Sequence, residues 1–166
     1  MIITGVKTDC YQVPLAVPLS DSIHGEMAHF EMVTVRLRTE TGLEGLGYTY
    51  TVGRGGVAVA ALLERELAEV LVGQPALANE ALWQRLAAAC NWIAGGALVL
   101  AISAVDIAVW DLKGKAAALP LYRLLGAERN RVPCYAGGVD LDFTLDALKA
   151  QADGFRRRGF RAIKMK

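Results

Sequence analysis

The apolar stretch over residues 98–117 constrains the fold of this chain more than any other feature. Its large side chains recur at helical spacing. They are Leu98, Ile102, Val105, Val109 and Leu112. The opposite face is also mostly Ala, Val and Ile, and a helix that is apolar nearly all round must be covered on both sides. The charge-free run 91–105 is shorter than the roughly 18–20 residues that span a bilayer, so the stretch predicts a buried helix.

Charge and cysteine content exclude several classes of protein. The 166 residues carry 18 Lys and Arg against 17 Asp and Glu, a net charge of +1, which predicts no general attraction for nucleic acid or an anionic membrane. Cys10, Cys90 and Cys134 are odd in number and form no CxxC pair. A reducing, cytoplasmic location is therefore expected. The first residues lack the basic and apolar regions of a signal peptide, so they are not expected to be one.

The first half of the chain predicts strands followed by helices. A strand over 2–13 is expected to end at Pro14 and Pro18. The segment 31–39 alternates, with Val33, Val35 and Leu37 on one face, and 43–50 supplies a partner strand, which predicts an antiparallel meander. Two helices should follow, the second with Asn79 as its N-cap. Their expected inward residues are Leu63, Leu67, Val70 and Leu71 in the first helix, and Leu82, Trp83 and Leu86 in the second.

The last part of the chain predicts a parallel strand–helix–strand unit. A strand over 131–139 precedes a helix that Thr144 can cap and that Gly159 can end. Its expected inward residues are Leu145, Leu148 and Ala152. A second strand over 160–166 follows. One such unit leaves sheet edges and an apolar helix face uncovered, so the architecture is unfinished.

Two lysines in the last predicted strand are candidates for chemistry. Because successive side chains of a strand alternate, Lys164 and Lys166 share a face, with Cα atoms about 6.6–7 Å apart. In an enclosed space, like-charge repulsion and desolvation would disfavour the protonated amine, so that one lysine could act as a general base. On a solvated edge strand, the same lysines would only discourage aggregation.

A longer pattern distinguishes these two hypotheses. The run AVDIAVWDLKGK at 104–115 is followed by PLYRLLG at 120–126 and then by strand, helix and Lys-Met-Lys. In this order the whole chain resembles the mandelate racemase/muconate-lactonizing enzyme family of the enolase superfamily. The resemblance implies an α+β capping domain over residues 1–128, an antiparallel three-stranded meander plus helices. It implies that residues 129–166 begin a (β/α) TIM-like barrel with its first βαβ unit.

The resemblance also implies a reaction. The family abstracts the proton α to a carboxylate and stabilises the enediolate on Mg²⁺; Lys166 corresponds to its base, and Lys164 to the neighbour that tunes charge and contacts the substrate carboxylate. The family's metal ligands lie on the next three barrel strands, so Mg²⁺ is expected for the full-length enzyme and no metal ligand is assigned here. The chain alone is expected to be inactive, either as a truncated product or as one part of a barrel that another chain completes.

Two loops correspond to those that select the substrate in the family, 20–29 and 48–56. His24, Tyr50 and Arg54 are the candidate substrate contacts: a proton-bearing ring, a phenol and a permanent cation suited to a carboxylate. Each also has an ordinary structural interpretation, as a solvated loop residue or, for Tyr50, a residue that pins the sheet. The pair His24 and His29 does not match HExxH zinc spacing, and residues 53–56 lack the spacing of a phosphate-binding loop.

The function hypotheses fall into two classes. The first is a Mg²⁺-dependent enzyme acting on a small-molecule carboxylate, without nucleic acid or membrane partners and as a homo-oligomer. Because the loop residues are polar, a sugar acid is favoured, and a lyase (dehydratase) leads an isomerase (racemase, epimerase or cycloisomerase). The second is a capping-domain fragment without activity that self-associates through its uncovered βαβ unit.

Overall fold

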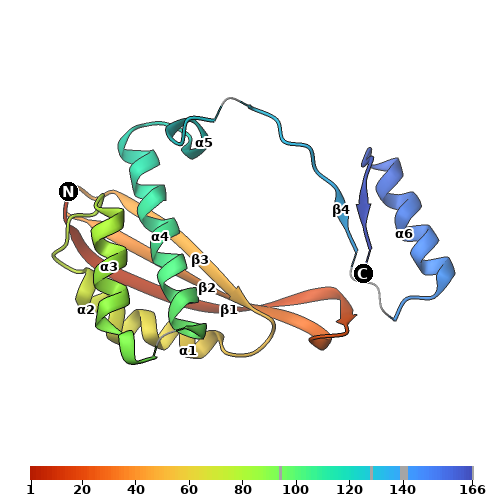
Figure 1. Cartoon of the computed structure of the whole chain (residues 1–166), viewed down its shortest axis with the longest axis horizontal. Helices are drawn as coiled ribbons and strands as arrows, with labels where there is room; N and C mark the ends of the chain where they lie inside the picture. Colours follow the sequence, from red (N-terminus) through yellow and green to blue (C-terminus); the bar gives the residue numbers. More distant parts are fainter. Residues whose placement is uncertain (94, 128, 139–141, 166) are drawn as a thin grey trace. The chain divides into compact units, whose positions relative to one another are not determined.

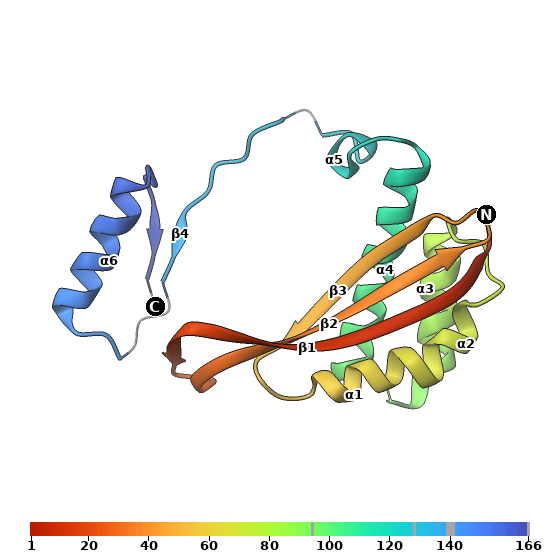
Figure 2. The same ribbon diagram turned by 180° about the vertical axis from the view of Figure 1, so that it is seen from behind.

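A three-stranded antiparallel sheet forms the centre of the first part of the chain (Figures 1 and 2). The computed structural model describes residues 1–93, 95–127, 129–138 and 142–165. The strands are β1 (Ile3–Asp21), β2 (Gly25–Thr39) and β3 (Glu44–Thr51), in the order β1-β2-β3. The pairing of β2 with β3 runs from Glu31 opposite Thr51 to Arg38 opposite Glu44. The predicted meander is confirmed.

Alternation along β2 buries one face of this sheet. Val33, Val35 and Leu37 are fully buried, whereas Arg36 and Arg38 are exposed. Burying each of these apolar side chains contributes about 1.5–3 kcal/mol. The period-two pattern therefore identified the core face of the strand correctly.

β1 is longer than predicted, because it continues through Pro14 and Pro18 to Asp21. β1 is an edge strand of the sheet, and an edge strand tolerates proline where the missing N–H would face solvent. The polar segment expected to be a loop is correspondingly short: residues 22–24 form the turn, and β2 already begins at Gly25. Gly25 has φ +67°, a conformation that favours glycine.

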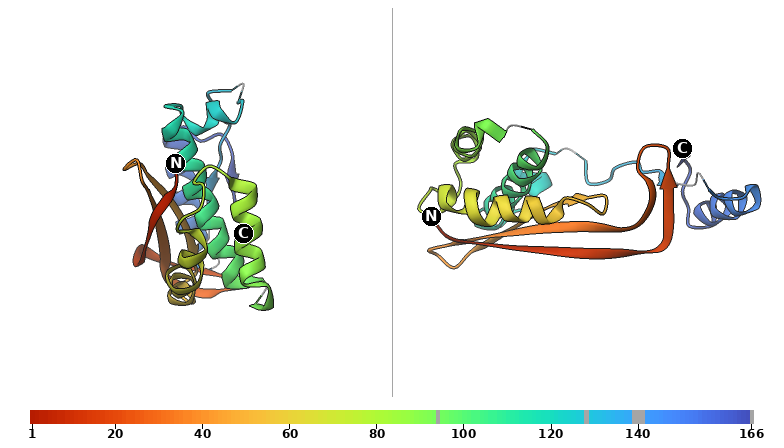
Figure 3. Two further views of the ribbon diagram at one scale, coloured as in Figure 1. Left: turned by 90° about the vertical axis from the view of Figure 1, so that its left-hand side faces the viewer. Right: turned by 90° about the horizontal axis from the view of Figure 1, so that it is seen from below.

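Helices cover one face of the sheet, as Figure 3 shows from the side. α1 (Gly56–Ala61) continues through a π-helical turn, η1 (Leu62–Leu67), into α2 (Ala68–Leu71). α3 (Asn79–Ala89), the short 3₁₀ turn η2 (Asn91–Ile93) and α4 (Gly96–Ala116) follow. The core joins the buried face of β2 to residues from these helices. Its fully buried helical members include Leu63, Leu67, Leu71, Leu86, Val105, Val109 and Leu112.

Two details of α3 were predicted wrongly. Asn79 is the first residue of the helix, and the preceding Ala78 occupies the cap position without a side-chain hydrogen bond. The Asn79 amide instead donates to Asp106 Oδ1 at 3.4 Å. Trp83 is 53% exposed, while Leu82 and Leu86 are buried as predicted. The apolar stripe that α3 turns toward the core contains Leu82 and Leu86 but not Trp83.

α4 is the central helix predicted from the apolar stretch. It packs on β3 and also contacts α1, α3 and α5 (Leu121–Leu124), so it is covered from more than one side. The residues predicted for its main face are buried, and so are Ala101, Ala104 and Ala108. Among the residues that the structure describes, no helix has the length and hydropathy needed to cross a membrane.

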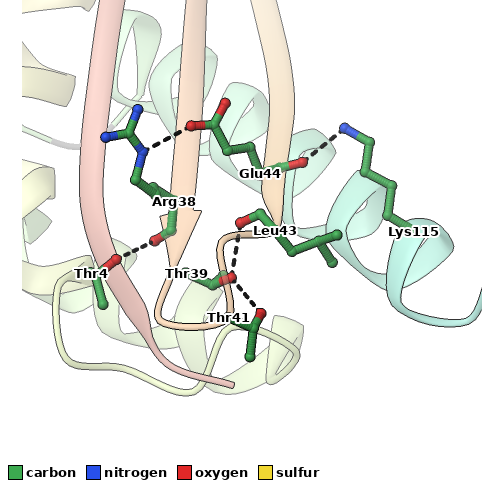
Figure 4. Close-up of polar contacts among 7 residues, drawn as sticks. All are labelled: Thr4, Arg38, Thr39, Thr41, Leu43, Glu44 and Lys115. Atoms are coloured by element: carbon green, nitrogen blue, oxygen red, sulfur yellow. Dashed lines mark hydrogen bonds and ion pairs between the residues drawn. The ribbon is translucent and has the colours of Figure 1, made fainter.

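Polar contacts attach α4 to the free edge of β3. Asp111 Oδ2 accepts a hydrogen bond from the backbone N–H of Leu46 at 2.8 Å and one from Lys115 Nζ at 2.7 Å. Lys115 Nζ also donates to the backbone carbonyl of Glu44 at 2.8 Å, and the Glu44 carboxylate accepts from Arg38 Nε at 2.8 Å (Figure 4). Two charged residues of the 104–115 motif thus have a structural role.

The remaining part of the chain contains the strand–helix–strand unit. β4 (Ala136–Gly137) pairs in parallel with β5 (Ile163–Lys164), and α6 (Leu145–Arg157) connects them. Thr144 caps α6 by accepting from the Ala147 N–H at 3.3 Å, as predicted. Both strands are shorter than predicted, and no described residue of α6 is fully buried; Leu145 is 65% exposed. Two paired strands offer too little surface to cover the helix.

Contacts divide the chain into two compact units. One comprises Met1–Val13 and Phe30–Glu128, and the other comprises Pro14–His29 and Arg129–Lys166. The second unit thus joins the tip of the β1–β2 hairpin with the strand–helix–strand segment. The division into domains at residues 1–128 and 129–166 stays a prediction.

Candidate functional site

The turn between β1 and β2 holds one candidate, His24, in a defined geometry. His24 Nδ1 lies 2.9 Å from Asp21 Oδ2 and 3.0 Å from Asp21 Oδ1. Asp21 Oδ1 also accepts from the backbone N–H groups of Ile23, at 2.9 Å, and His24, at 2.7 Å. Asp21 is buried, whereas the His24 side chain is 43% exposed. A buried carboxylate therefore holds one edge of a ring whose other edge can meet a ligand.

Tyr50 lies on the sheet face opposite the helices and is 57% exposed. Its ring meets Phe30 edge to face, with centroids 5.9 Å apart. The two residues line an open hollow of about 420 Å³ together with Val13, Met32 and Tyr48. The contact with Phe30 agrees with a role in the sheet, and more than half of Tyr50 is accessible to a ligand.

Arg54 is exposed in the loop between β3 and α1. Among the described residues, the structure gives its guanidinium no hydrogen-bond or ion-pair partner. Gly53 and Gly55 on either side have φ +74° and +97°, which bends the loop in a way that other residues rarely adopt. The cation is therefore available to a carboxylate, as the prediction requires.

A buried carboxylate occupies the start of α1. Glu31 Oε2 accepts from the Gly56 N–H at 2.7 Å and from Thr51 Oγ1 at 2.7 Å. Phosphate binding at this glycine-rich loop would use the same N–H group. Because the Glu31 carboxylate already accepts from the Gly56 N–H, this group is not free to bind a phosphate.

Lys164 lies at the end of β5, opposite Gly137. Its backbone carbonyl accepts from the Gly138 N–H at 3.0 Å, which holds the end of the strand in place. The Lys164 side chain is exposed. Lys166, the predicted base, lies outside the described residues.

The candidates are divided between the two compact units. His24 and Lys164 belong to the compact unit that includes the hairpin tip, whereas Tyr50 and Arg54 belong to the other. Within the described part of the chain, no group of three or more His, Cys, Asp or Glu could hold a metal ion, so the zinc alternative at residues 24–29 gains no support.

Sequence reasoning missed Asp21 and Glu31. The signal for Asp21 was present, because Asp at the first position of a turn accepts hydrogen bonds from N–H groups two and three residues later. Glu31 could not be found from the sequence: its donors lie 20 and 25 residues away, and only the strand register brings them together.

Comparison with known proteins extends these observations. Residues 3–126 match the family described as mandelate racemase/muconate lactonizing enzyme, N-terminal domain. The chain is 49% identical over 166 residues to 3,6-anhydro-alpha-L-galactonate cycloisomerase of Streptomyces coelicolor, covering 99% of this chain and 46% of that protein.

Two solved structures are also similar. A racemase from Streptomyces coelicolor A3(2) with bound magnesium superposes with a TM-score of 0.96 at 48% identity, over 99% of this chain and 46% of the other. L-talarate/galactarate dehydratase from Salmonella typhimurium LT2, liganded with Mg and L-lyxarohydroxamate, gives 0.91 at 33% identity, over 99% and 44%. The chain therefore spans less than half the length of these relatives.

Proposed function

Because this chain belongs to the mandelate racemase/muconate lactonizing enzyme family, we propose that it is the N-terminal portion of an enolase-superfamily enzyme that abstracts the α-proton of a sugar-acid carboxylate. The observation that carries the proposal is 49% identity over 99% of the chain to an enzyme named for a sugar acid. Lys164 at the end of the last strand and Lys166, two residues later in the sequence, supply the residues for the chemistry.

Lys166 is the proposed proton acceptor, and Lys164 the neighbouring cation. Lys164 is exposed within a sheet of two described strands. A general base at neutral pH needs the enclosure that depresses a lysine pKa. We assign that enclosure to further barrel strands, in the region that the relatives have beyond the matched part.

Mg²⁺ is the proposed cofactor, since two of the similar structures contain magnesium. The described residues do not fit a magnesium site, because they include no cluster of three or more potential ligands. We therefore place the ligands outside the described part of the chain, and propose that the 166 residues alone are inactive. The full-length enzyme is proposed to be a cytoplasmic homo-oligomer.

His24, Tyr50 and Arg54 are the proposed substrate contacts from the capping loops. The guanidinium of Arg54, which has no partner within the described part of the chain, suits a carboxylate, because arginine offers two parallel N–H donors to its two oxygens. The exposed edge of His24 and the phenol of Tyr50 suit hydroxyl groups. Such a set favours a polyhydroxylated acid over an aromatic one.

Two reactions are candidates for the step after proton abstraction, dehydration and cycloisomerisation. The sequence favours dehydration, and a dehydratase is among the similar structures. Cycloisomerisation is the second candidate, favoured by the higher identity to the cycloisomerase. Incubating the full-length enzyme and Mg²⁺ with a panel of sugar acids, followed by mass spectrometry, separates them: dehydration removes one water, and isomerisation leaves the mass unchanged. No conversion of any sugar acid, with turnover of an aromatic hydroxy acid instead, would overturn the substrate class.

A further inference from the structure

The turn between β1 and β2 contains a contact between Asp21 and His24 that has no role in the proposed function so far. We propose that Asp21 is a positioning residue: it fixes the neutral His24 ring as the Nδ1–H tautomer, so that Nε2 is presented as an acceptor for a hydroxyl group of the substrate. This inference rests on the proposed function for the identity of the ligand. The state of the ring follows from the geometry of the turn and can be measured without activity.

The tautomer follows from the chemistry of the partner. An ionised carboxylate accepts hydrogen bonds and cannot donate them. Asp21 Oδ1 already accepts from two backbone N–H groups, at 2.9 and 2.7 Å, which is the acceptor role of a carboxylate oxygen. Since His24 Nδ1 lies 2.9–3.0 Å from both carboxylate oxygens, Nδ1 must carry the proton. In a neutral ring, Nε2 is then unprotonated.

The turn holds this arrangement in place. Asp21 is the last residue of β1, Gly25 begins β2 in a left-handed conformation, and only three residues lie between them. The Asp21 side chain is 7% exposed and is therefore shielded from water. Within the described residues, the structure gives His24 Nε2 no hydrogen-bond partner. The free edge of the ring is thus available to a ligand.

An Nε2 acceptor selects for hydroxyl groups. A sugar-acid hydroxyl can donate to it, whereas a carboxylate oxygen has no proton to donate to a neutral ring. Replacing the tautomer by the Nε2–H form would turn the same atom into a donor and change which groups it can bind. The equivalent exchange of Asp for Asn beside a catalytic histidine leaves the geometry intact and reverses the tautomer.

Nitrogen-15 NMR of the 166-residue chain tests the inference directly. The chain has two histidines, His24 and His29, so His29→Gln assigns the spectrum. At about pH 9, above the usual imidazole range, long-range ¹H–¹⁵N correlations should show His24 as Nδ1–H. In Asp21→Asn, the amide oxygen can still accept from the backbone, and its NH₂ faces the ring, so His24 should change to Nε2–H. A wild-type ring in the Nε2–H form, or an unchanged tautomer in Asp21→Asn, would overturn the proposal.

Kinetics of the full-length enzyme test the ligand. Asp21→Asn should lower kcat/KM for the sugar-acid substrate about tenfold, the effect of losing one hydrogen bond, mainly through KM. Ser22→Ala, in the same turn and exposed, should change neither the tautomer nor kcat/KM. An unchanged kcat/KM in Asp21→Asn would overturn the hydroxyl contact. If the enzyme converts no sugar acid while the tautomer is as described, the proposed function fails and the positioning by Asp21 stands.

Discussion

The carbonyl oxygen of Ala104 on α4 occupies the place where a Cβ atom on Gly47 of β3 would lie. The backbone N of Ala108 would be only 2.6 Å from this added Cβ atom. One turn further along, Gly45 meets Ala108 and Leu112 in the same way. Helix and strand therefore pack with backbone against backbone, which explains why small residues line this face of α4.

Replacing Gly47 by Ala should destabilise the protein. The added methyl group would force α4 away from β3, and overpacking of this kind costs about 1–3 kcal/mol. Urea denaturation measures the free energy of unfolding. Gly5→Ala on β1 is the matched control, because its new Cβ would meet only Arg38 Cβ at 4.0 Å. Equal stability of the two variants would contradict the close packing.

The predicted and observed folds differ where tertiary contacts decide. The spacing of apolar residues was sufficient to predict β2 and α4. The residue type of Thr144 was sufficient to predict the cap of α6. Each of these signals reports local geometry. The end of β1 was missed because proline ends most strands, and only the edge position of β1 permits Pro14 and Pro18. The lengths of β4 and β5 depend on neighbouring strands that a local pattern does not contain.

Asp111→Ala should cost about 1 kcal/mol of stability, because the Leu46 N–H and Lys115 lose their acceptor. Asp111→Asn keeps an oxygen for the Leu46 N–H and loses only the charge. Since both partners of the ion pair are partly exposed, that loss should stay below about 1 kcal/mol. Denaturation curves of the two variants should therefore separate, and a larger loss in Asp111→Asn than in Asp111→Ala would contradict the edge contact.

The reactivity of Cys10 should depend on Glu31. Although Cys10 is an exposed residue, partial desolvation raises the pKa of its thiol, and the negative charge of Glu31 raises it further. Because the thiolate is the reactive form, alkylation of Cys10 should need a higher pH than that of an ordinary cysteine. In Glu31→Gln the pKa should fall, and the rate profile should move to lower pH. Mass spectrometry of alkylated peptides measures the rates, with Cys134 as the reference in each sample. A profile that stays in place would exclude the influence of Glu31.

The 166-residue chain should bind Mg²⁺ no better than an arbitrary soluble domain. Its described residues contain no cluster of three or more potential ligands, and Mg²⁺ needs near-octahedral oxygen coordination. Isothermal titration calorimetry provides the measurement, with Ca²⁺ as a comparison cation. Binding at one site with micromolar affinity would place a metal site in this part of the enzyme.

The candidate site was only partly accessible from the sequence. His24 and Arg54 stood out as polar residues in glycine-containing loops, and Lys164 by its spacing from Lys166. Asp21 was missed because its role depends on the geometry of the turn that brings His24 Nδ1 to its carboxylate. Whether Lys164 is enclosed depends on neighbouring strands, which no local spacing can report.

Exchange of the substrate α-hydrogen in D₂O tests the proposed chemistry most directly. In the full-length enzyme with Mg²⁺, ¹H NMR should show loss of the α-proton signal of a sugar acid. Lys166→Ala should abolish this exchange, because the proton acceptor is gone, while circular dichroism and thermal unfolding stay as in the wild type. Exchange at an undiminished rate in Lys166→Ala would show that another group removes the proton.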